Sequence, residues 1–108
     1  MKILKCAQSD KANSEKYLLM DGDRQIGYGY IIETEMNPIE IFVNEEERSN
    51  GYGKLLFKNL IQIAKGNGKN ALFFEIKREN YRFTNIVSSS GARRVGTNDG
   101  ITKWVLPL

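Results

Sequence analysis

The chain has 108 residues, of which 41% are hydrophobic and 27% are charged, so one domain spanning residues 1–108 with a single core is expected. It contains no histidine and one cysteine, which excludes Ser-His-Asp and Cys-His catalysis and metal sites built from histidines or several thiolates. No apolar run is long enough for a membrane-spanning helix or a signal peptide, and Cys6 cannot form an intrachain disulfide. We therefore expect a cytoplasmic protein.

Charge is divided unevenly along the chain, although the net charge is only +3. Residues 1–50 contain six Lys/Arg and ten Asp/Glu, a net charge of −4, whereas residues 51–108 contain ten and three, a net charge of +7. The second half of the chain therefore favours an anionic ligand. A solvated basic surface without a ligand is the alternative that charge alone leaves open.

The first 43 residues predict strands, because apolar and β-branched residues alternate there. The expected strands are Ile3–Ala7, Lys16–Met20, Arg24–Ile32 and Pro38–Val43. Asp21-Gly22-Asp23 predicts a hairpin turn between the second and third strands, since aspartate and glycine tolerate the positive φ of tight turns. The polar residues Ser9–Glu15 predict a loop.

The rest of the chain predicts two helices that alternate with strands. After a polar loop over Asn44–Asn50, apolar residues recur with helical spacing from Tyr52 to Ala64, and Gly66-Asn67-Gly68 ends this helix. Asn80 is the expected N-cap of a helix that ends near Gly91. The remaining expected strands are Ala71–Ile76, Ala92–Val95 and Ile101–Leu106. The order β-β-β-β-α-β-α-β-β predicts an α/β (mixed α+β) domain, with helices on the faces of a mixed sheet.

The segment Arg48-Ser49-Asn50-Gly51-Tyr52-Gly53-Lys54 opens the first helix and has the chemistry of a phosphate-binding loop. Glycines allow a ligand to approach the backbone, and the first N–H groups of a helix are unpaired donors with partial positive charge. Arg48 and Lys54 add formal charge, so a diphosphate is the expected ligand. The spacing matches neither a Walker A loop nor a Rossmann fingerprint. A loop whose glycines only make a sharp turn is the alternative.

This segment, with the strand before it, resembles the acyl-CoA-binding motif Arg/Gln-x-x-Gly-x-Gly/Ala of the GNAT N-acetyltransferase superfamily. The resemblance extends over about residues 16–106, and it implies an acyl-CoA N-acyltransferase fold in which two neighbouring strands diverge to admit acetyl-CoA. It implies that backbone groups near Phe42 and Val43 pair with the pantetheine arm and that Asn80 approaches the CoA. The residues whose amides would hold the pyrophosphate are Arg48, Ser49, Asn50, Gly51, Tyr52, Gly53 and Lys54. Lys77, Arg78 and Arg82 would then lie near the 3′-phosphate, or else form a solvated face.

The resemblance implies a short N-acetyltransferase that moves an acetyl group from acetyl-CoA to an amine by direct attack. The amine would belong to a small molecule or a protein, and no metal is expected. With no histidine, a carboxylate acting through water is the expected base, and Glu40 interrupts an otherwise apolar strand near the expected acyl group. A buried Glu40 would have a raised pKa, which suits a base. The alternative is a Glu40 that faces solvent on an alternating strand.

Two departures from the family pattern support an alternative function. Ser9–Glu15 is too short for the helices that shape the acceptor site in the family, and Val87 stands where many members have a tyrosine that protonates the CoA thiolate. These departures favour a catalytically weak acetyl-CoA-binding module that regulates a partner protein. A nucleic-acid-binding role is disfavoured, because the aromatic residues do not alternate with basic ones. Tyr28, Tyr30, Phe73, Phe74 and Trp104 are instead expected in the core.

Overall fold

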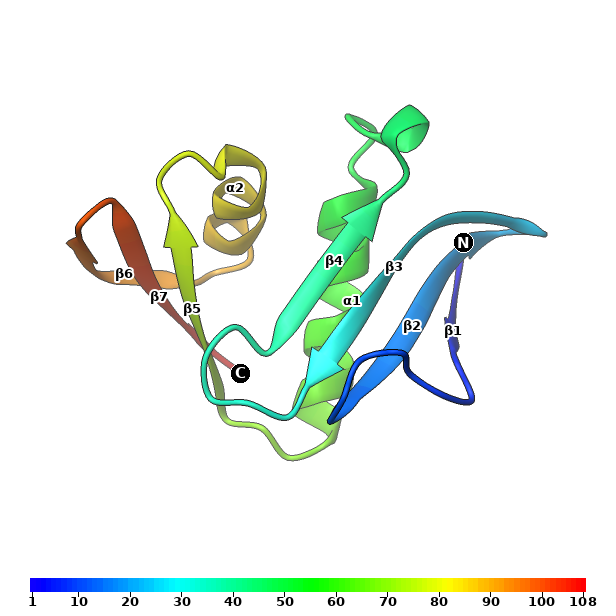
Figure 1. Cartoon of the computed structure of the whole chain (residues 1–108), viewed down its shortest axis with the longest axis horizontal. Coiled ribbons are helices and arrows are strands. Elements are labelled where there is room, and N and C mark those ends of the chain that lie inside the picture. The colour runs from blue at the N-terminus through cyan, green and yellow to red at the C-terminus, as the bar shows by residue number, and fades with distance from the viewer.

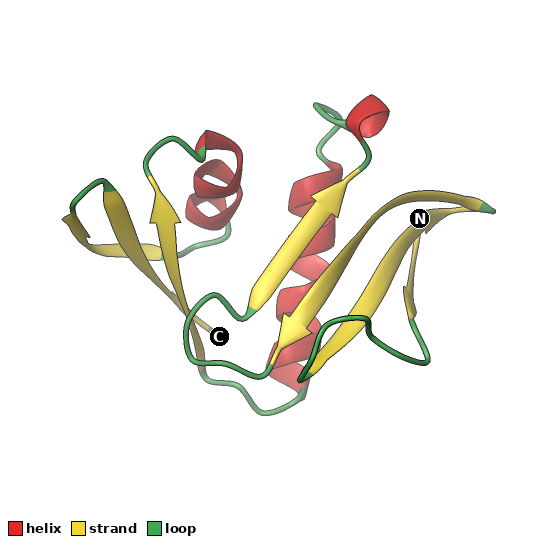
Figure 2. Ribbon diagram, in the orientation of Figure 1, coloured by secondary structure: helices red, strands yellow, loops and turns green.

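Four strands in succession precede the first helix, as the alternating hydrophobic residues predict. The computed structural model describes all residues, 1–108. The elements in chain order are β1 (Lys2–Lys5), β2 (Ser14–Asp21), β3 (Arg24–Ile32), β4 (Ile39–Val43), the short 3-10 helix η1 (Glu45–Glu47), α1 (Tyr52–Gly66), β5 (Ala71–Lys77), α2 (Tyr81–Ser89), β6 (Arg93–Asn98) and β7 (Ile101–Pro107). The predicted order of helices and strands and the mixed α+β class are confirmed (Figure 2). No helix combines the length and apolar character needed to cross a membrane.

The strands form two sheets that are joined at one end. The first sheet has the order β1-β2-β3-β4 and the second has the order β5-β7-β6. An isolated parallel bridge links Met36, just before β4, to Phe73 on β5. Asn37 closes this end, because its N–H donates to the Phe73 carbonyl and its side-chain oxygen accepts from the Glu75 N–H, both at 2.9 Å. Beyond this link β4 and β5 diverge in a V (Figure 1), which leaves one edge of each strand without a neighbouring strand.

Both helices pack against one hydrophobic core. The ring of Phe57 on α1 lies 5.7 Å from the rings of Phe74 on β5 and Phe83 on α2, measured between centroids. Gly29 allows α1 to approach β3 closely, since a Cβ atom there would lie 2.7 Å from Cδ1 of Leu60. The core therefore fixes the beginning of α1 relative to β4 and α2, and these three elements border the candidate site.

The opposite face of the first sheet carries no helix. The register aligns Leu4, Leu18, Tyr28 and Phe42 in one row across all four strands. Leu4 and Phe42 are exposed, and the rings of Tyr28 and Phe42 stack with their centroids 4.9 Å apart. We call this surface the open face. Residues 6–13, which connect β1 to β2, contain no helix, so only this loop lies against the open face.

The structure corrects several expectations about packing. Phe73, expected in the core, is 46% exposed because it points to the opposite face of β5 from the buried Phe74. Along α1, Phe57 and Ile61 are buried because the helix is covered by both the sheet and α2. The helical spacing of apolar residues does not include these two positions, since it runs through Tyr52, Leu55, Leu56, Leu60, Ile63 and Ala64. The first strand ends at Lys5 rather than Ala7.

Candidate functional site

The connection between β4 and α1 presents backbone N–H groups that have no partner within the helix. Gly51 is the N-cap, and no side chain caps this end of α1. The first backbone bond inside the helix runs from the Leu55 N–H to the Gly51 carbonyl, at 3.1 Å, so the N–H groups of residues 52–54 are left without a helical partner. The first turn contains no acidic residue. These donors and the positive end of the helix dipole together favour an anion.

The two glycines of the loop have different structural roles. Gly51 has a φ of 81°, which side chains rarely tolerate, and a Cβ atom there would meet nothing within 4 Å. Gly53 has ordinary helical backbone, but a Cβ atom there would lie 2.9 Å from Cδ1 of Ile86 on α2. Gly51 therefore allows the chain to turn and leaves open space beside the N–H groups, whereas Gly53 allows α1 and α2 to approach each other.

The loop is tied to the hairpin between β2 and β3. The buried carboxylate of Glu47 forms an ion pair with Arg24, which also bonds to Asp21 at 3.2 Å. The pKa of Arg24 is raised, first by its hydrogen bond to Asp21 and then by the charge of Glu47. The Asn44 side chain donates to the Gln25 carbonyl at 2.7 Å. Sequence reasoning missed this anchor, because Arg24 and Glu47 are 23 residues apart and neither belongs to the motif.

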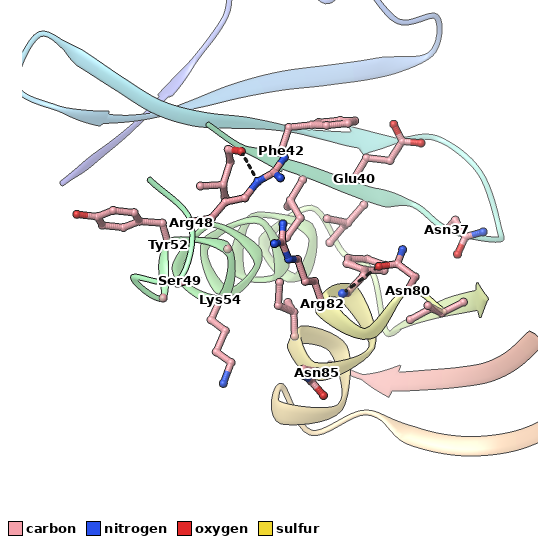
Figure 3. A pocket seen from close by; sticks show the side chains of 18 of the residues that line it. Asn37, Glu40, Phe42, Arg48, Ser49, Tyr52, Lys54, Asn80, Arg82 and Asn85 are labelled. Carbon is pink, nitrogen blue, oxygen red and sulfur yellow. Dashed lines mark hydrogen bonds between the residues drawn. The ribbon is translucent and has the colours of Figure 1, made fainter. Parts of the chain in front are cut away.

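A groove of about 1060 Å³ extends from this loop between the diverging strands (Figure 3). Nine of the ten residues predicted to bind a cofactor line it, namely Phe42, Val43, Arg48, Ser49, Gly51, Tyr52, Gly53, Lys54 and Asn80. The exception is Asn50, whose side-chain amide instead donates to the Glu47 carbonyl at 3.2 Å. The predicted residues are thus brought together by β4, the loop, α1 and α2.

The groove has an excess of unpaired positive charge. Four lining cations, Arg48, Lys54, Lys77 and Arg82, take part in no ion pair. Three of the four lining glutamates do, since Glu40, Glu47 and Glu75 pair with Lys11, Arg24 and Lys103. In Figure 3, Arg82 extends from α2 toward β4, and the Arg48 Nε donates to the Val43 carbonyl at 3.2 Å. The charges therefore favour an anionic ligand, as the basic second half of the sequence predicts.

The free edge of β4 supplies backbone groups to the groove. The bond from the Asn44 N–H to the Ile26 carbonyl, at 2.9 Å, sets which residues of β4 bond to β3. By alternation the backbone of Phe42 faces β3, whereas the N–H and carbonyl groups of Ile41 and Val43 face the groove. This corrects the expectation for Phe42, which lines the groove with its side chain. Ile41 was missed by sequence reasoning, although the alternation of the strand could have identified it.

Asn80 lies at the groove but is already used in the fold. Its side-chain oxygen accepts from the Phe83 N–H at 3.3 Å, which makes it the N-cap that the sequence predicts for α2. Its amide nitrogen is free of any such bond and borders the groove. Lys77 and Arg82 also line the groove, whereas Arg78, proposed together with them, does not.

Glu40 borders the groove but is not buried. Its side chain is 37% exposed, on the open face, and its Oε1 lies 3.0 Å from Nζ of Lys11. Of the two alternatives for Glu40, the structure therefore has the one that faces solvent on an alternating strand, because the residues of β4 that face the core are Ile39, Ile41 and Val43. Glu40 can still accept a proton from a group at the edge of the groove.

Val87 contributes nothing to the groove. It is fully buried in the core, and the hydroxyl of the neighbouring Ser88 bonds to the Asn85 carbonyl at 3.3 Å. No hydroxyl of this part of α2 lines the groove.

The chain shares its architecture with proteins of known structure. No curated protein sequence matches the chain. Among solved structures, an acetyltransferase from Bacillus subtilis in complex with CoA superimposes with a TM-score of 0.80 at 15% identity, covering 99% of this chain and 98% of that one. A domain from Methanocaldococcus jannaschii has a TM-score of 0.75 at 16% identity, covering 92% of this chain and 70% of that one. The protein yncA from Salmonella typhimurium with its cofactor acetyl-CoA has a TM-score of 0.70 at 18% identity, covering 88% of this chain and 65% of that one.

These structures share the fold, and the Bacillus subtilis protein shares the short length as well. The decisive match is by sequence, since a model of the acetyltransferase (GNAT) family matches residues 4–85, about three quarters of the chain. The match runs from within β1 to the first half of α2 and so includes β2, β3, β4, the loop before α1, α1 itself and β5. The chain therefore belongs to the GNAT family of acetyltransferases.

Proposed function

We propose that the protein is an N-acetyltransferase that uses acetyl-CoA and transfers the acetyl group to an amine by direct attack. The observation that carries this proposal is the groove, which joins an anion-binding helix end to an unpaired strand edge. Acetyl-CoA has the matching chemistry, because a diphosphate is followed by an extended arm that contains amide groups. The acetyl-CoA and CoA complexes of yncA and of the Bacillus subtilis protein support the same ligand.

Each part of the groove has a role in this proposal. The N–H groups of residues 52–54, with Arg48 and Lys54, hold the diphosphate, and the open space beside Gly51 admits it. The backbone of Ile41 and Val43 pairs with the amides of the arm as a further strand would. Lys77 and Arg82 bind the remaining phosphate. Acetyl-CoA supplies an activated acetyl group, and no metal is required.

Glu40 is the proposed base. An amine attacks only when it is neutral, so a proton must leave it in the groove. The Glu40 carboxylate already pairs with an ammonium, that of Lys11, at 3.0 Å, and this contact supports its assignment as the base. Its exposure allows a proton to pass on to solvent through water.

The proposal is tested by ligand binding and turnover. At 100 times its dissociation constant, acetyl-CoA should stabilise the fold by about 2.7 kcal/mol, measured as a rise in melting temperature, and the shift should decrease with salt. CoA release should then be saturable in acetyl-CoA and depend on an added amine. No thermal shift at millimolar acetyl-CoA in folded protein would refute the cofactor assignment.

One observation supports a second function. Because Val87 is buried and no hydroxyl of α2 lines the groove, α2 supplies no acid for the CoA thiolate. A protein that binds acetyl-CoA and regulates a partner would not need one. Acetyl-CoA binding without amine-dependent release of CoA, across a broad panel of amines, would identify this function.

A further inference from the structure

Lys11 places an amine at the border of the groove. Its Nζ lies 3.0 Å from Oε1 of Glu40 and 5.4 Å from the centre of the Tyr30 ring, on the open face. The Lys11 side chain is 40% exposed, and Glu40 itself lines the groove. The ammonium of Lys11 thus occupies the position that the proposed mechanism requires of an acceptor amine, which is within hydrogen-bond distance of the base.

The loop between β1 and β2 holds Lys11 in this position. The Lys11 N–H donates to Oγ of Ser9 at 3.2 Å, and its carbonyl accepts from Oγ of Ser14 at 2.7 Å. The preceding residue, Asp10, accepts a hydrogen bond from the Tyr30 hydroxyl at 2.7 Å. Lys11 is therefore fixed on both sides of its backbone, so the closeness of its amine to Glu40 does not depend on the side chain alone.

Glu40 lies toward the closed end of the groove, away from the phosphate-binding loop. It comes three positions before Val43, which is about 10 Å along an extended strand. Figure 3 shows Glu40 beyond Phe42, on the side of Asn37, with Arg48 and Tyr52 at the opposite end. A long ligand whose diphosphate lies at the loop and whose arm follows β4 therefore has its far end near Glu40.

We infer that Lys11 is an acetyl acceptor, and that the protein acetylates its own Lys11 when no external amine is present. This inference rests on the proposed function. A bond forms between Nζ of Lys11 and the acetyl carbon, and the bond between that carbon and the thioester sulfur breaks, with its electron pair leaving on sulfur. Of the three ammonium protons, one stays on the amide, one passes by way of Glu40 to solvent, and one protonates the thiolate.

Lys5 provides a matched control within the same chain. It also pairs with a glutamate, Glu15, and it is more exposed than Lys11, at 58% against 40%. In both lysines the pKa of the amine is raised, chiefly by the hydrogen bond to the glutamate. Glu15 does not line the groove. Reaction of lysines with acetyl-CoA in bulk solution would thus label Lys5 at least as fast as Lys11.

The experiment incubates the full chain with acetyl-CoA that carries an isotopically labelled acetyl group, without added amine, and follows each lysine by peptide mass spectrometry. Lys11 should be labelled about 10-fold or more faster than Lys5, because its amine is held beside the thioester. The labelled fraction at a given time should not change on dilution of the protein, since Lys11 and Glu40 belong to one chain. Equal labelling of the two lysines would overturn the inference.

The variant Glu40→Gln separates catalysed from uncatalysed labelling by the sign of its effect. The carboxylate raises the pKa of the Lys11 amine, so its removal leaves more neutral amine, and an uncatalysed reaction would become faster. Loss of the base and of the ion pair should instead slow labelling of Lys11 by about 10-fold or more, with Lys5 unchanged. Faster labelling in Glu40→Gln would also overturn the inference.

The same samples distinguish this inference from the proposed function. Acetyl-CoA binding is measured by thermal shift, and transfer to an added amine is measured by CoA release. If both are observed while Lys11 remains unlabelled, the inference is wrong and the proposed function stands. If acetyl-CoA does not bind, both are wrong.

Discussion

A Cβ atom at Gly53 would lie 2.9 Å from Cδ1 of Ile86, so the first turn of α1 and the second half of α2 meet where the groove passes between them. The same atom would lie 3.8 Å from Cδ1 of Ile41 and 3.9 Å from Cγ2 of Val43, both on β4. Gly53 therefore sets the spacing of three elements that line the groove. The glycine of the motif acts here through packing between helices, in addition to any contact with a ligand.

The first prediction follows from this contact. Gly53→Ala should lower acetyl-CoA affinity, because Ile86 must move away from α1 and the groove changes shape. Ile86→Val removes Cδ1 and should restore most of the affinity when combined with Gly53→Ala. Titration of the two single variants and the double variant measures this coupling. If the losses of affinity in the two single variants simply add in the double variant, the methyl group added at Gly53 acts on the ligand directly.

The second prediction concerns the free edge of β4. Val43→Pro removes an N–H that faces the groove, and proline is tolerated on an edge strand when its missing N–H is not needed for pairing. The variant should fold and lose the equivalent of one hydrogen bond to acetyl-CoA, about 2- to 10-fold in affinity. Phe42→Pro removes an N–H that faces β3 and should instead destabilise the fold. Circular dichroism and acetyl-CoA titration of both variants test which N–H groups of β4 face the groove. A folded Phe42→Pro with weakened binding would show that the Phe42 N–H faces the groove instead.

The parts of this fold that follow local patterns could be predicted, and the contacts between distant residues could not. The strand over Arg24–Ile32 and the start of α1 after Gly51 are set by alternation and by turn chemistry, which are visible in a few consecutive residues. The pairing of Lys11 with Glu40 spans 29 positions and depends on the β1–β2 loop lying across the open face. No local pattern indicates this pairing, whereas the outward direction of the Glu40 side chain follows from the alternation of β4.

The cations proposed to bind phosphate also show which features a local pattern can predict and which it cannot. Lys77, Arg78 and Arg82 belong to one basic segment, so composition treats them alike. In the fold Lys77 ends β5 and Arg82 lies in the first turn of α2, and both line the groove, whereas Arg78 does not. Only the geometry of the turn between β5 and α2 separates them.

This difference yields the third prediction, with Arg78 as the control. Arg82→Ala should weaken acetyl-CoA binding by about 2- to 5-fold, the range for a partly exposed ion pair, and should reduce its salt dependence. Arg78→Ala carries the same change in net charge and should leave both quantities within error. Titrations at two salt concentrations make the comparison. Equal effects of the two variants would mean that the segment acts only through its overall charge.

The fourth prediction is a pH dependence of stability. The hydrogen bond from Tyr30 to Asp10 lowers the pKa of the carboxyl below its ordinary 3.8 and raises the pKa of the phenol to about 12. The lowered pKa of Asp10 stabilises the fold above pH 3.8, and this stabilisation is lost as the pH falls below that value. The raised pKa of Tyr30 stabilises the fold below pH 10, and this stabilisation is lost as the pH rises from 10 toward 12. The difference in unfolding free energy between wild type and Asp10→Ala should therefore be constant from about pH 5 to pH 9 and shrink outside that range.

Asp23→Ala serves as the control for this measurement, because Asp23 takes part in no ion pair and no side-chain hydrogen bond. Denaturant melts of both variants across the pH range give the two curves. A stability difference for Asp10→Ala that changes steadily between pH 5 and pH 9 would contradict the assignment of the Tyr30–Asp10 bond. Asp10→Ala should also slow acetyl labelling of Lys11, since it removes the hydrogen bond to Tyr30 that holds the loop carrying this lysine.

The last prediction separates an enzyme from a regulatory binder, and it concerns Glu40. Glu40→Gln keeps the size of the side chain but cannot accept a proton. If Glu40 is the base, acetyl-CoA affinity should stay nearly unchanged, because the phosphate-binding loop and the free edge of β4 are intact. Release of CoA in the presence of an added amine should fall by about 10²–10⁴-fold, the usual range for loss of a general base. The measurement is a rate profile of both proteins against a panel of amines, with binding followed in parallel.

Glu33→Gln is the matched control for Glu40→Gln. Glu33 also pairs with a lysine, Lys69, at 3.3 Å, but it lies outside the groove, so its replacement should leave the rate unchanged. Equal rates for wild type and Glu40→Gln would remove Glu40 from the mechanism, and the base would then have to be water or another lining carboxylate such as Glu79. Binding of acetyl-CoA with no amine-dependent rate in either protein would favour the regulatory function, for which the buried Val87 is the supporting observation.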